Sequence, residues 1–515
     1  MNDVAALARS VMCVGFEGRT AADAPLAALR AFGPGAIILF ARNIGTSGEL
    51  RGLVGALRAV SDPAPLIAID QEGGRVARIG AEIVAELPAP LAVAAGRDVD
   101  RCERLGVLLG SQLAALGISV DFAPCGDLAL EPRNTVIGNR SYGSAPHDVA
   151  RFSGAFARGL ERGGVAAAIK HFPGHGATHI DTHLALPHIE VDAATLRTRD
   201  LVPFASAIAS EAVSIVMTAH IIVDALDAEN PATMSRRVLM GVLRDELGFE
   251  DVIATDCLEM DAIARGVGTE RGARLALAAG ADLLLISHQL DLAAAAAIGI
   301  SDAIARGELS SDRLASAAKR VSALRTRFAT LSPAVLDAED EAGPLLAAQA
   351  AVTLVRGDIA LRKDLAVTVI SFEGAIADGA AGVRERAPSL SAALRARRWK
   401  SEVMRVPLEP DDDDIDLLLA HLPALGDRNF IIVTRRAHLY AGQARAVARL
   451  LAAVPGAIVI SAREPYDIAR LDAARNLACI YGDEAISFEG AADVLSGRAS
   501  ARGILPIAID HPTLR

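Results

Sequence analysis

Eight short apolar runs, rich in β-branched residues, recur between residues 11 and 287 and limit the folds open to this chain. The runs are 11–16, 36–40, 66–70, 120–124, 166–172, 214–220, 251–256 and 282–287. Helix-like segments rich in Ala, Leu and Arg lie between them. Eight alternations of strand and helix predict a (β/α)8 TIM-type barrel rather than a doubly wound sheet. Continuous apolar runs are typical of parallel strands that helices cover on the outside.

A second series of strands follows this predicted barrel. A helix over 311–328 ends the first unit, and residues 331–343 form a Pro-containing, acidic connection. Six more apolar runs then alternate with helical patterns, which predicts a smaller α/β domain with a mostly parallel sheet. We therefore expect a catalytic barrel over 1–330, a linker over 331–345 and a C-terminal α/β domain over 346–515. Within this domain, Asp411 to Asp414 are expected to form a solvated loop.

Composition excludes several classes of function. The chain has 515 residues, 52% apolar and 22% charged, with a net charge of −11. This acidity, without a basic run or an Arg-rich face, argues against a nucleic-acid or anionic-membrane partner. No apolar stretch reaches the roughly 18 residues that a bilayer requires, and no signal peptide is recognisable. Five scattered cysteines without CxxC spacing suit a reducing compartment, so we expect a cytoplasmic protein.

Polar or ionisable residues end seven of the eight predicted barrel strands. They are Arg42 and Asn43, Asp70, Asp127, Lys170 and His171, His220, Asp256, and Ser287 and His288. Barrel enzymes place their catalytic groups at this rim, whereas a structural protein has little reason to gather polar groups there. The pattern therefore favours an enzyme.

Histidines concentrate after the fifth predicted strand. Five of the eleven histidines lie between His171 and His188, and four of them have helical i, i+4 spacing. This spacing suggests metal ligands on a helix. However, Pro173 and two glycines, Gly174 and Gly176, disfavour a helix here. We therefore predict a long loop and no metal site.

Three residues have the properties needed for acid, base or nucleophilic chemistry. Asp256 follows a buried strand, where its carboxylate can act as a nucleophile, a base or a metal ligand; capping of the next helix is the structural alternative. Asp181 and His183 lie two apart, so the carboxylate can orient the imidazole as a general acid/base. Two carboxylates and one histidine at a single rim match displacement at a sugar carbon.

These motifs resemble glycoside hydrolase family 3, specifically its β-N-acetylglucosaminidase branch. The resemblance is carried by 70–76 (DQEGGRV), 170–176 (KHFPGHG), 181–183 (DTH) and 255–260 (TDCLEM). It implies a retaining hydrolase without a cofactor, in which Asp256 is the nucleophile and His183, oriented by Asp181, is the acid/base. The resemblance also implies that five residues hold the hydroxyls of the terminal sugar. They are Asp70, Arg78, Arg140, Lys170 and His171.

Several alternatives stay open at this stage. On the same site, a phosphorylase would use inorganic phosphate instead of water, and a broad-specificity β-glucosidase would accept a different sugar. A sugar-binding protein that keeps the barrel, or a metal-dependent hydrolase built on the histidines, are more distant alternatives. For the favoured activity we expect a small carbohydrate substrate, either muropeptides or chitooligosaccharides, and a monomer or weak homodimer.

Overall fold

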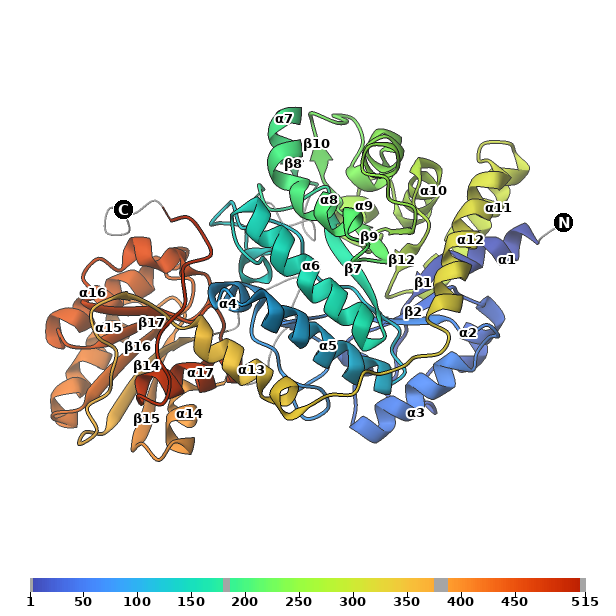
Figure 1. Ribbon diagram of the computed structural model, residues 1–515. Helices are drawn as coiled ribbons and strands as arrows, with labels where there is room; N and C mark the ends of the chain where they lie inside the picture. Colours follow the sequence, from blue (N-terminus) through green and yellow to red (C-terminus); the bar gives the residue numbers. More distant parts are fainter. Residues whose placement is uncertain (1–2, 179–185, 375–387, 510–515) are drawn as a thin grey trace.

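The computed structural model describes residues 3–178, 186–374 and 388–509. It contains two α/β units, a barrel coloured blue to yellow and a second unit coloured orange to red (Figure 1). Eight parallel strands form the barrel sheet and follow one another around it in chain order. They are β1 (Met12–Val14), β2 (Ala36–Leu39), β3 (Leu66–Ile69), β6 (Val120–Asp121), β7 (Ala166–Phe172), β9 (Ile215–Thr218), β11 (Val252–Ala254) and β12 (Leu284–Ile286).

The predicted barrel is therefore confirmed, because each of the eight apolar runs contains one of these strands. A bridge between Ala254 and Leu283 connects the last two strands and brings the sheet close to full closure. The helices of this unit are α1 (Val4–Ser10), α2 (Leu26–Phe32), α3 (Ser47–Arg58), α4 (Pro90–Ala95), α5 (Val99–Ala115), α6 (Pro146–Gly163), α7 (Ala193–Thr195), α8 (Val202–Ala209), α9 (Asp261–Ala264), α10 (Thr269–Ala279), α11 (Leu290–Ala305) and α12 (Ser311–Arg327).

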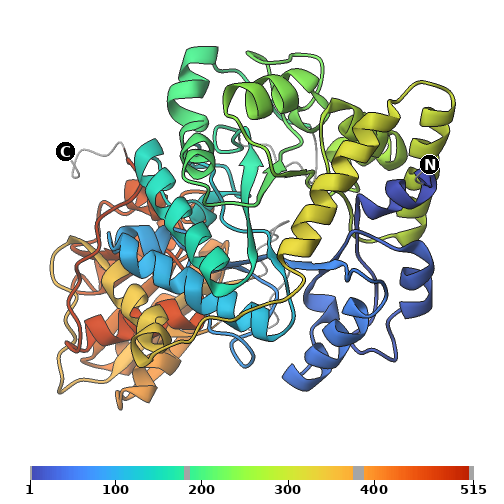
Figure 2. The ribbon, with the colours of Figure 1, turned by 45° about the vertical axis from the view of Figure 1, so that its right-hand side comes forward.

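Helix α12 lies at the N-terminal ends of the barrel strands, beside α1 in both views (Figures 1 and 2). Its Arg320 and Arg325 donate to the carbonyls of Glu250 and Ala64, which precede β11 and β3. Val321, Leu324 and Phe328 belong to the same apolar cluster as the inward side chains of the strands. The base of the barrel is therefore filled with side chains, and its opposite, carboxyl-terminal end is left for chemistry.

The second unit contains a six-stranded sheet in the order β13-β18-β17-β16-β14-β15, parallel except for β13. Its strands are β13 (Thr353–Arg356), β14 (Val367–Glu373), β15 (Ser401–Pro407), β16 (Asn429–Thr434), β17 (Ile458–Ser461) and β18 (Asn476–Cys479). Its helices are α14 (Leu390–Ala396), α15 (Asp412–His421), α16 (Ala441–Ala453) and α17 (Ala485–Leu495). Helices α15 and α16 cover one face of the sheet, and α14 and α17 the other. The expected mostly parallel sheet is confirmed.

Two segments differ from the sequence-based expectation. Part of the expected linker is helical, because α13 (Ala338–Ala351) begins at a capping box formed by Asp337 and Asp340. The expected loop Asp411–Asp414 is instead the start of α15: Asp411 is its N-cap and accepts from the backbone N–H of Asp414. Aspartates in the first turn of a helix complement its positive N-terminal end, which explains this acidic cluster. None of the helices in the described ranges combines the length and apolarity that a membrane crossing requires.

Candidate active site

Alternation of side chains along the strands brings three of the predicted residues into the barrel mouth. Ala68, Ala168 and Ala254 point into the apolar interior of the barrel. Because successive strand side chains alternate, residues two positions later face the same way. These residues are Asp70, Lys170 and Asp256, and all three line one cavity of about 460 Å³. The strand geometry therefore explains why three separated motifs meet at one place.

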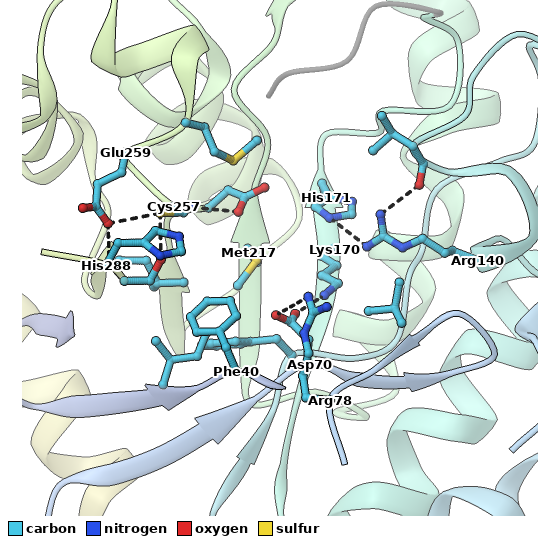
Figure 3. A pocket seen from close by; sticks show the side chains of 18 of the residues that line it. Phe40, Asp70, Arg78, Arg140, Lys170, His171, Met217, Cys257, Glu259 and His288 are labelled. Carbon is cyan, nitrogen blue, oxygen red and sulfur yellow. Dashed lines mark hydrogen bonds and ion pairs between the residues drawn. The ribbon is translucent and has the colours of Figure 1, made fainter. Parts of the chain in front are cut away.

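The cavity has an apolar floor and a polar wall. Inward side chains of the strands form the floor: Ile38, Phe122, Met217 and Leu285. In Figure 3, the cluster around Asp70, Lys170 and His171 lies on one side, and Cys257, Glu259 and His288 lie on the other. Five predicted sugar-binding residues line the polar part: Asp70, Arg78, Arg140, Lys170 and His171.

Lys170 is the centre of the ionic cluster in this wall. Its Nζ lies 2.7 Å from Asp70 Oδ1 and 2.7 Å from Glu72 Oε1. Burial would lower the pKa of Lys170, but these two carboxylates raise it above its ordinary value. The ammonium therefore stays charged, and its third N–H is available to a ligand hydroxyl.

Arginines complete the cluster. Arg140 donates to both oxygens of Glu72, from Nε at 2.8 Å and from Nη2 at 2.6 Å. Burial would raise the pKa of Glu72, but Arg140 and Lys170 hold it well below its ordinary value. Arg78 Nη2 lies 3.4 Å from Asp70 Oδ2, on the outer side of the cluster. The wall therefore offers fixed cations and carboxylates, which are the donors and acceptors that bind sugar hydroxyls.

His171 is held in one tautomer by its two neighbours. Its Nδ1 lies 2.6 Å from Asp127 Oδ2, and its Nε2 lies 3.3 Å from Arg140 Nη2. A carboxylate can only accept and a guanidinium can only donate, so the geometry fits an imidazole protonated at Nδ1. Burial would raise the pKa of Asp127, but His171 and the backbone N–H of His175 lower it to about 2.

His175 lies beside His171 and also lines the cavity, with only 2% of its surface exposed. Its ring meets that of His171 edge-on at 6.1 Å between centroids. Burial lowers the pKa of His175 to about 4, so the imidazole is neutral at physiological pH. The chain from Pro173 to Thr178 is irregular, as the glycines and proline predicted.

Asp256 lies two residues after the end of β11 and is partly exposed to the cavity. Its Oδ1 accepts the backbone N–H of Cys257 at 2.7 Å. His220 Nε2 lies 2.9 Å from the carbonyl oxygen of Cys257 and so holds this turn from the neighbouring strand. Burial raises the pKa of the Cys257 thiol to about 12, which makes it a poor nucleophile.

The remaining two predicted catalytic residues, Asp181 and His183, lie outside the described residues. The sequence interpretation also missed the buried partners of the cavity wall: Glu72, which pairs with Arg140 and Lys170, and Asp127, which pairs with His171. Glu72 lies within the 70–76 motif. In an extended chain it would face the same side as Asp70, two residues earlier, and this spacing could have indicated its place in the site. Asp127 was noted as a strand end, but only its contact with His171 reveals its role.

The second unit holds the loop that carries Arg140. Asn139 Nδ2 donates to the carbonyl of Tyr481 at 2.9 Å, and Arg436 Nη2 donates to that of Thr135 at 3.3 Å. Arg436 is also paired with Glu464, and both side chains are almost fully buried. The position of Arg140 in the cavity therefore depends on contacts between the two units.

Comparisons with known proteins agree with this geometry. The sequence model of the Glycosyl hydrolase family 3 N terminal domain matches residues 16–324. A beta-hexosaminidase A from Pseudoalteromonas piscicida is 33% identical over 334 residues, which are 60% of this chain and 56% of that protein. The chain thus spans little more than half the length of this relative. A beta-hexosaminidase from Alkalilimnicola ehrlichii is 40% identical over 49% of this chain and 74% of its own.

Solved structures resemble the chain over nearly its full length. A glycoside hydrolase family 3 beta-N-acetylglucosaminidase from Paenibacillus sp. str. FPU-7 has a TM-score of 0.91 and 32% identity, and the match covers 99% of both chains. A beta-glucoside phosphorylase has a TM-score of 0.80 at 20% identity, covering 99% of this chain and 94% of its own. At that identity, the second likeness concerns the fold alone.

Proposed function

The chain belongs to glycosyl hydrolase family 3, a family of glycoside hydrolases, and on that premise we propose that it is a retaining exo-β-N-acetylglucosaminidase. It removes terminal, non-reducing N-acetylglucosamine from β-linked glycosides. The names of the curated relatives and of the full-length structural neighbour support this sugar. The source of the glycoside is a muropeptide or a chitooligosaccharide, and we expect the enzyme to act in the cytoplasm as a monomer or weak homodimer.

The proposed reaction has two displacements. Asp256 attacks the anomeric carbon while His183, oriented by Asp181, gives a proton to the leaving oxygen. The glycosyl–Asp256 ester is then hydrolysed by water, and His183 takes back a proton from that water. The result is a free sugar with retained configuration.

The ionic cluster has the role of binding the sugar. Asp70 accepts from hydroxyls, and Lys170 and Arg78 donate to them, so adjacent hydroxyls can be bound in pairs. Arg140 and His171 extend this set along the wall of the cavity. A histidine acid/base suits such a site, because it adds no second anion beside Asp256 and the developing oxocarbenium charge.

The observation that carries the proposal is that Asp256 lines the same cavity as Asp70, Lys170 and Arg140. The test is a turnover panel of aryl β-N-acetylglucosaminide against aryl β-glucoside, with and without inorganic phosphate. We expect preference for the N-acetyl sugar and free N-acetylglucosamine as product. A sugar 1-phosphate would identify a phosphorylase, and preference for glucoside would identify a β-glucosidase.

A second measurement separates an enzyme from a sugar-binding protein. A 2-deoxy-2-fluoro glycoside with a good leaving group should form a slowly hydrolysed ester, and peptide mapping should locate it on Asp256. Asp261 lines the same cavity and is the internal control for this labelling. Binding without covalent labelling would contradict the proposed mechanism.

A further inference from the structure

Three side chains of the ligand types that zinc prefers meet at the cavity wall opposite the ionic cluster (Figure 3). They are Cys257, Glu259 and His288, and one ligand atom of each lies within 4.8 Å of the others. Cys257 Sγ and Glu259 Oε2 are 3.7 Å apart. Ligands at roughly 2.0–2.3 Å from a tetrahedral zinc are separated from one another by roughly 3.3–3.8 Å. The thiol and the carboxylate therefore already have the spacing of two zinc ligands.

The framework around these groups is fixed, and the third ligand is accessible. Glu259 accepts from the backbone N–H groups of His288 and Gln289, at 2.7 and 3.1 Å, just before α11 begins. Each carboxylate oxygen has a second lone pair, so these bonds leave room for a metal. His288 is exposed, its ring stacks on Phe40 at 5.4 Å between centroids, and its ligand nitrogen lies within 4.8 Å of the other two ligand atoms.

The charges near this group favour a cation. Asp256 and Asp261 line the same cavity. Arg42 is paired with Glu17 at 2.9 Å, and Arg265 is paired with Asp261 at 3.1 Å. A divalent ion would therefore enter a region in which carboxylates outnumber cations.

A second group of three potential ligands among the described residues does not share these properties. Cys125, Asp127 and His171 are all buried, and Asp127 already pairs with His171. A metal there would have to displace a hydrogen bond that holds the sugar-binding wall. The accessible group is therefore the stronger metal site.

We propose that Cys257, Glu259 and His288 form an inhibitory site for zinc-type divalent cations. Coordination exchanges the thiol proton of Cys257 for the metal, and the proton leaves to the buffer. The fourth position faces the cavity and takes water. A bound dication occupies space beside Asp256 and attracts electron density from its carboxylate, which weakens it as a nucleophile. This inhibition rests on the proposed function, whereas the binding itself does not.

Titration of the intact protein with Cd²⁺, a spectroscopic substitute for zinc, tests the binding. We expect a thiolate-to-cadmium charge-transfer band that saturates at one ion per chain. Cys257→Ser should remove the band. Glu259→Gln and His288→Gln keep the thiol and should weaken binding by at least about 10–100-fold, the loss that follows even from removing an outer-shell partner. Cys102→Ser, a buried thiol on α5, and Cys125→Ser should leave the band unchanged.

Inhibition is measured separately, with each variant compared with its own metal-free rate. Zn²⁺ should inhibit the wild type reversibly, with recovery after chelation, and should inhibit His288→Gln much less. No band in the wild type, a band that persists in Cys257→Ser, or one lost in Cys125→Ser would overturn the site. Binding without inhibition would overturn its inhibitory role. If neither the wild type nor any variant turns over substrate without metal, the proposed function fails. The cadmium titration then still decides the metal site.

Discussion

Glu72 and Arg140 form a two-bond ion pair inside the cavity wall, and at most 4% of either side chain is exposed. Glu72 also lies 2.7 Å from Lys170. Two buried cations therefore share this carboxylate, and Lys170 has a second partner in Asp70.

Replacement of Glu72 by glutamine should destabilise the protein strongly. It leaves Arg140 and Lys170 without their shared anion, so we expect the free energy of unfolding to fall by about 3 kcal/mol. Denaturant unfolding measures this change. The matched control is Glu246→Gln, because Glu246 forms the same two-bond pair with Arg197 on the surface, at 2.6 and 2.9 Å. There the loss should stay below about 1 kcal/mol. Equal losses at the two positions would contradict the importance of burial.

Replacement of Asp256 by asparagine should remove nearly all turnover, by on the order of 10⁴-fold or more in kcat, because no glycosyl ester can form. Single-turnover kinetics with an aryl N-acetylglucosaminide measures it. Asp261→Asn is the control, since Asp261 lines the same cavity but pairs with Arg265 at 3.1 Å. Comparable losses in the two variants would argue for a general effect of cavity charge.

The loss of kcat/KM caused by replacing His183 with alanine should depend on the leaving group of the substrate. Glycosides with activated aryl groups need little protonation, so their kcat/KM should fall far less than that of alkyl or sugar aglycones. The measurement is a series of substrates ordered by leaving-group pKa. His188→Ala, an exposed histidine 3.3 Å from Asp224, is the control. An equal loss for good and poor leaving groups would exclude the acid role.

His175 should make stability depend on pH between about 4 and 6.5. Its folded-state pKa is about 4, against an ordinary value of 6.5, because burial and the neighbouring His171 and Arg140 disfavour the charged ring more than Asp127 favours it. Below pH 6.5 the unfolded chain takes up a proton that the folded protein does not, so stability falls as pH falls through this window. Across this window the neutral His175 ring lowers the free energy of unfolding by about 3 kcal/mol.

The variant His175→Asn should therefore lose less stability than the wild type between pH 7 and pH 4.5. Denaturant unfolding at both pH values measures the difference. His421→Asn, an exposed histidine at the end of α15, should follow the wild type. Parallel pH profiles for His175→Asn and the wild type would show that the ring is not buried in its neutral form.

Replacement of Glu464 by alanine should weaken sugar binding in the barrel cavity, although Glu464 belongs to the second unit. Glu464 lies 3.0 Å from Arg436, which holds Thr135 in the loop before Arg140. Loss of this support should raise KM by about 10–100-fold, because small displacements of binding groups are costly. The control is Asp416→Asn, which breaks the exposed pair with Arg449 in the same unit. An unchanged KM would mean that the barrel positions Arg140 unaided.

Sequence patterns were sufficient to predict the strands, but they could not predict which buried side chains of the site contact one another. Each barrel strand is an apolar run buried on both sides, so composition alone reveals it. Alternation then places Asp70, Lys170 and Asp256 correctly, because it follows from strand geometry. The roles of Glu72 and Asp127 depend on distant pairings, Glu72 with Arg140 across 68 residues and Asp127 with His171 across 44, which no local pattern contains. The start of α15 was missed for a different reason: Asp411 and Asp414 have the spacing of a capping box but were interpreted as solvated charge.

The filled base of the barrel affects the order of events at the proposed site. Val321, Leu324 and Phe328 of the α12 region fill the end opposite the mouth, so a sugar in the cavity has no passage through the barrel axis. The terminal sugar therefore enters the cavity first and leaves it last. The aglycone must leave through the same entrance before a water molecule can reach the glycosyl ester. Long polymers would have to present a chain end rather than thread through, which makes shortening from one terminus the natural mode of action.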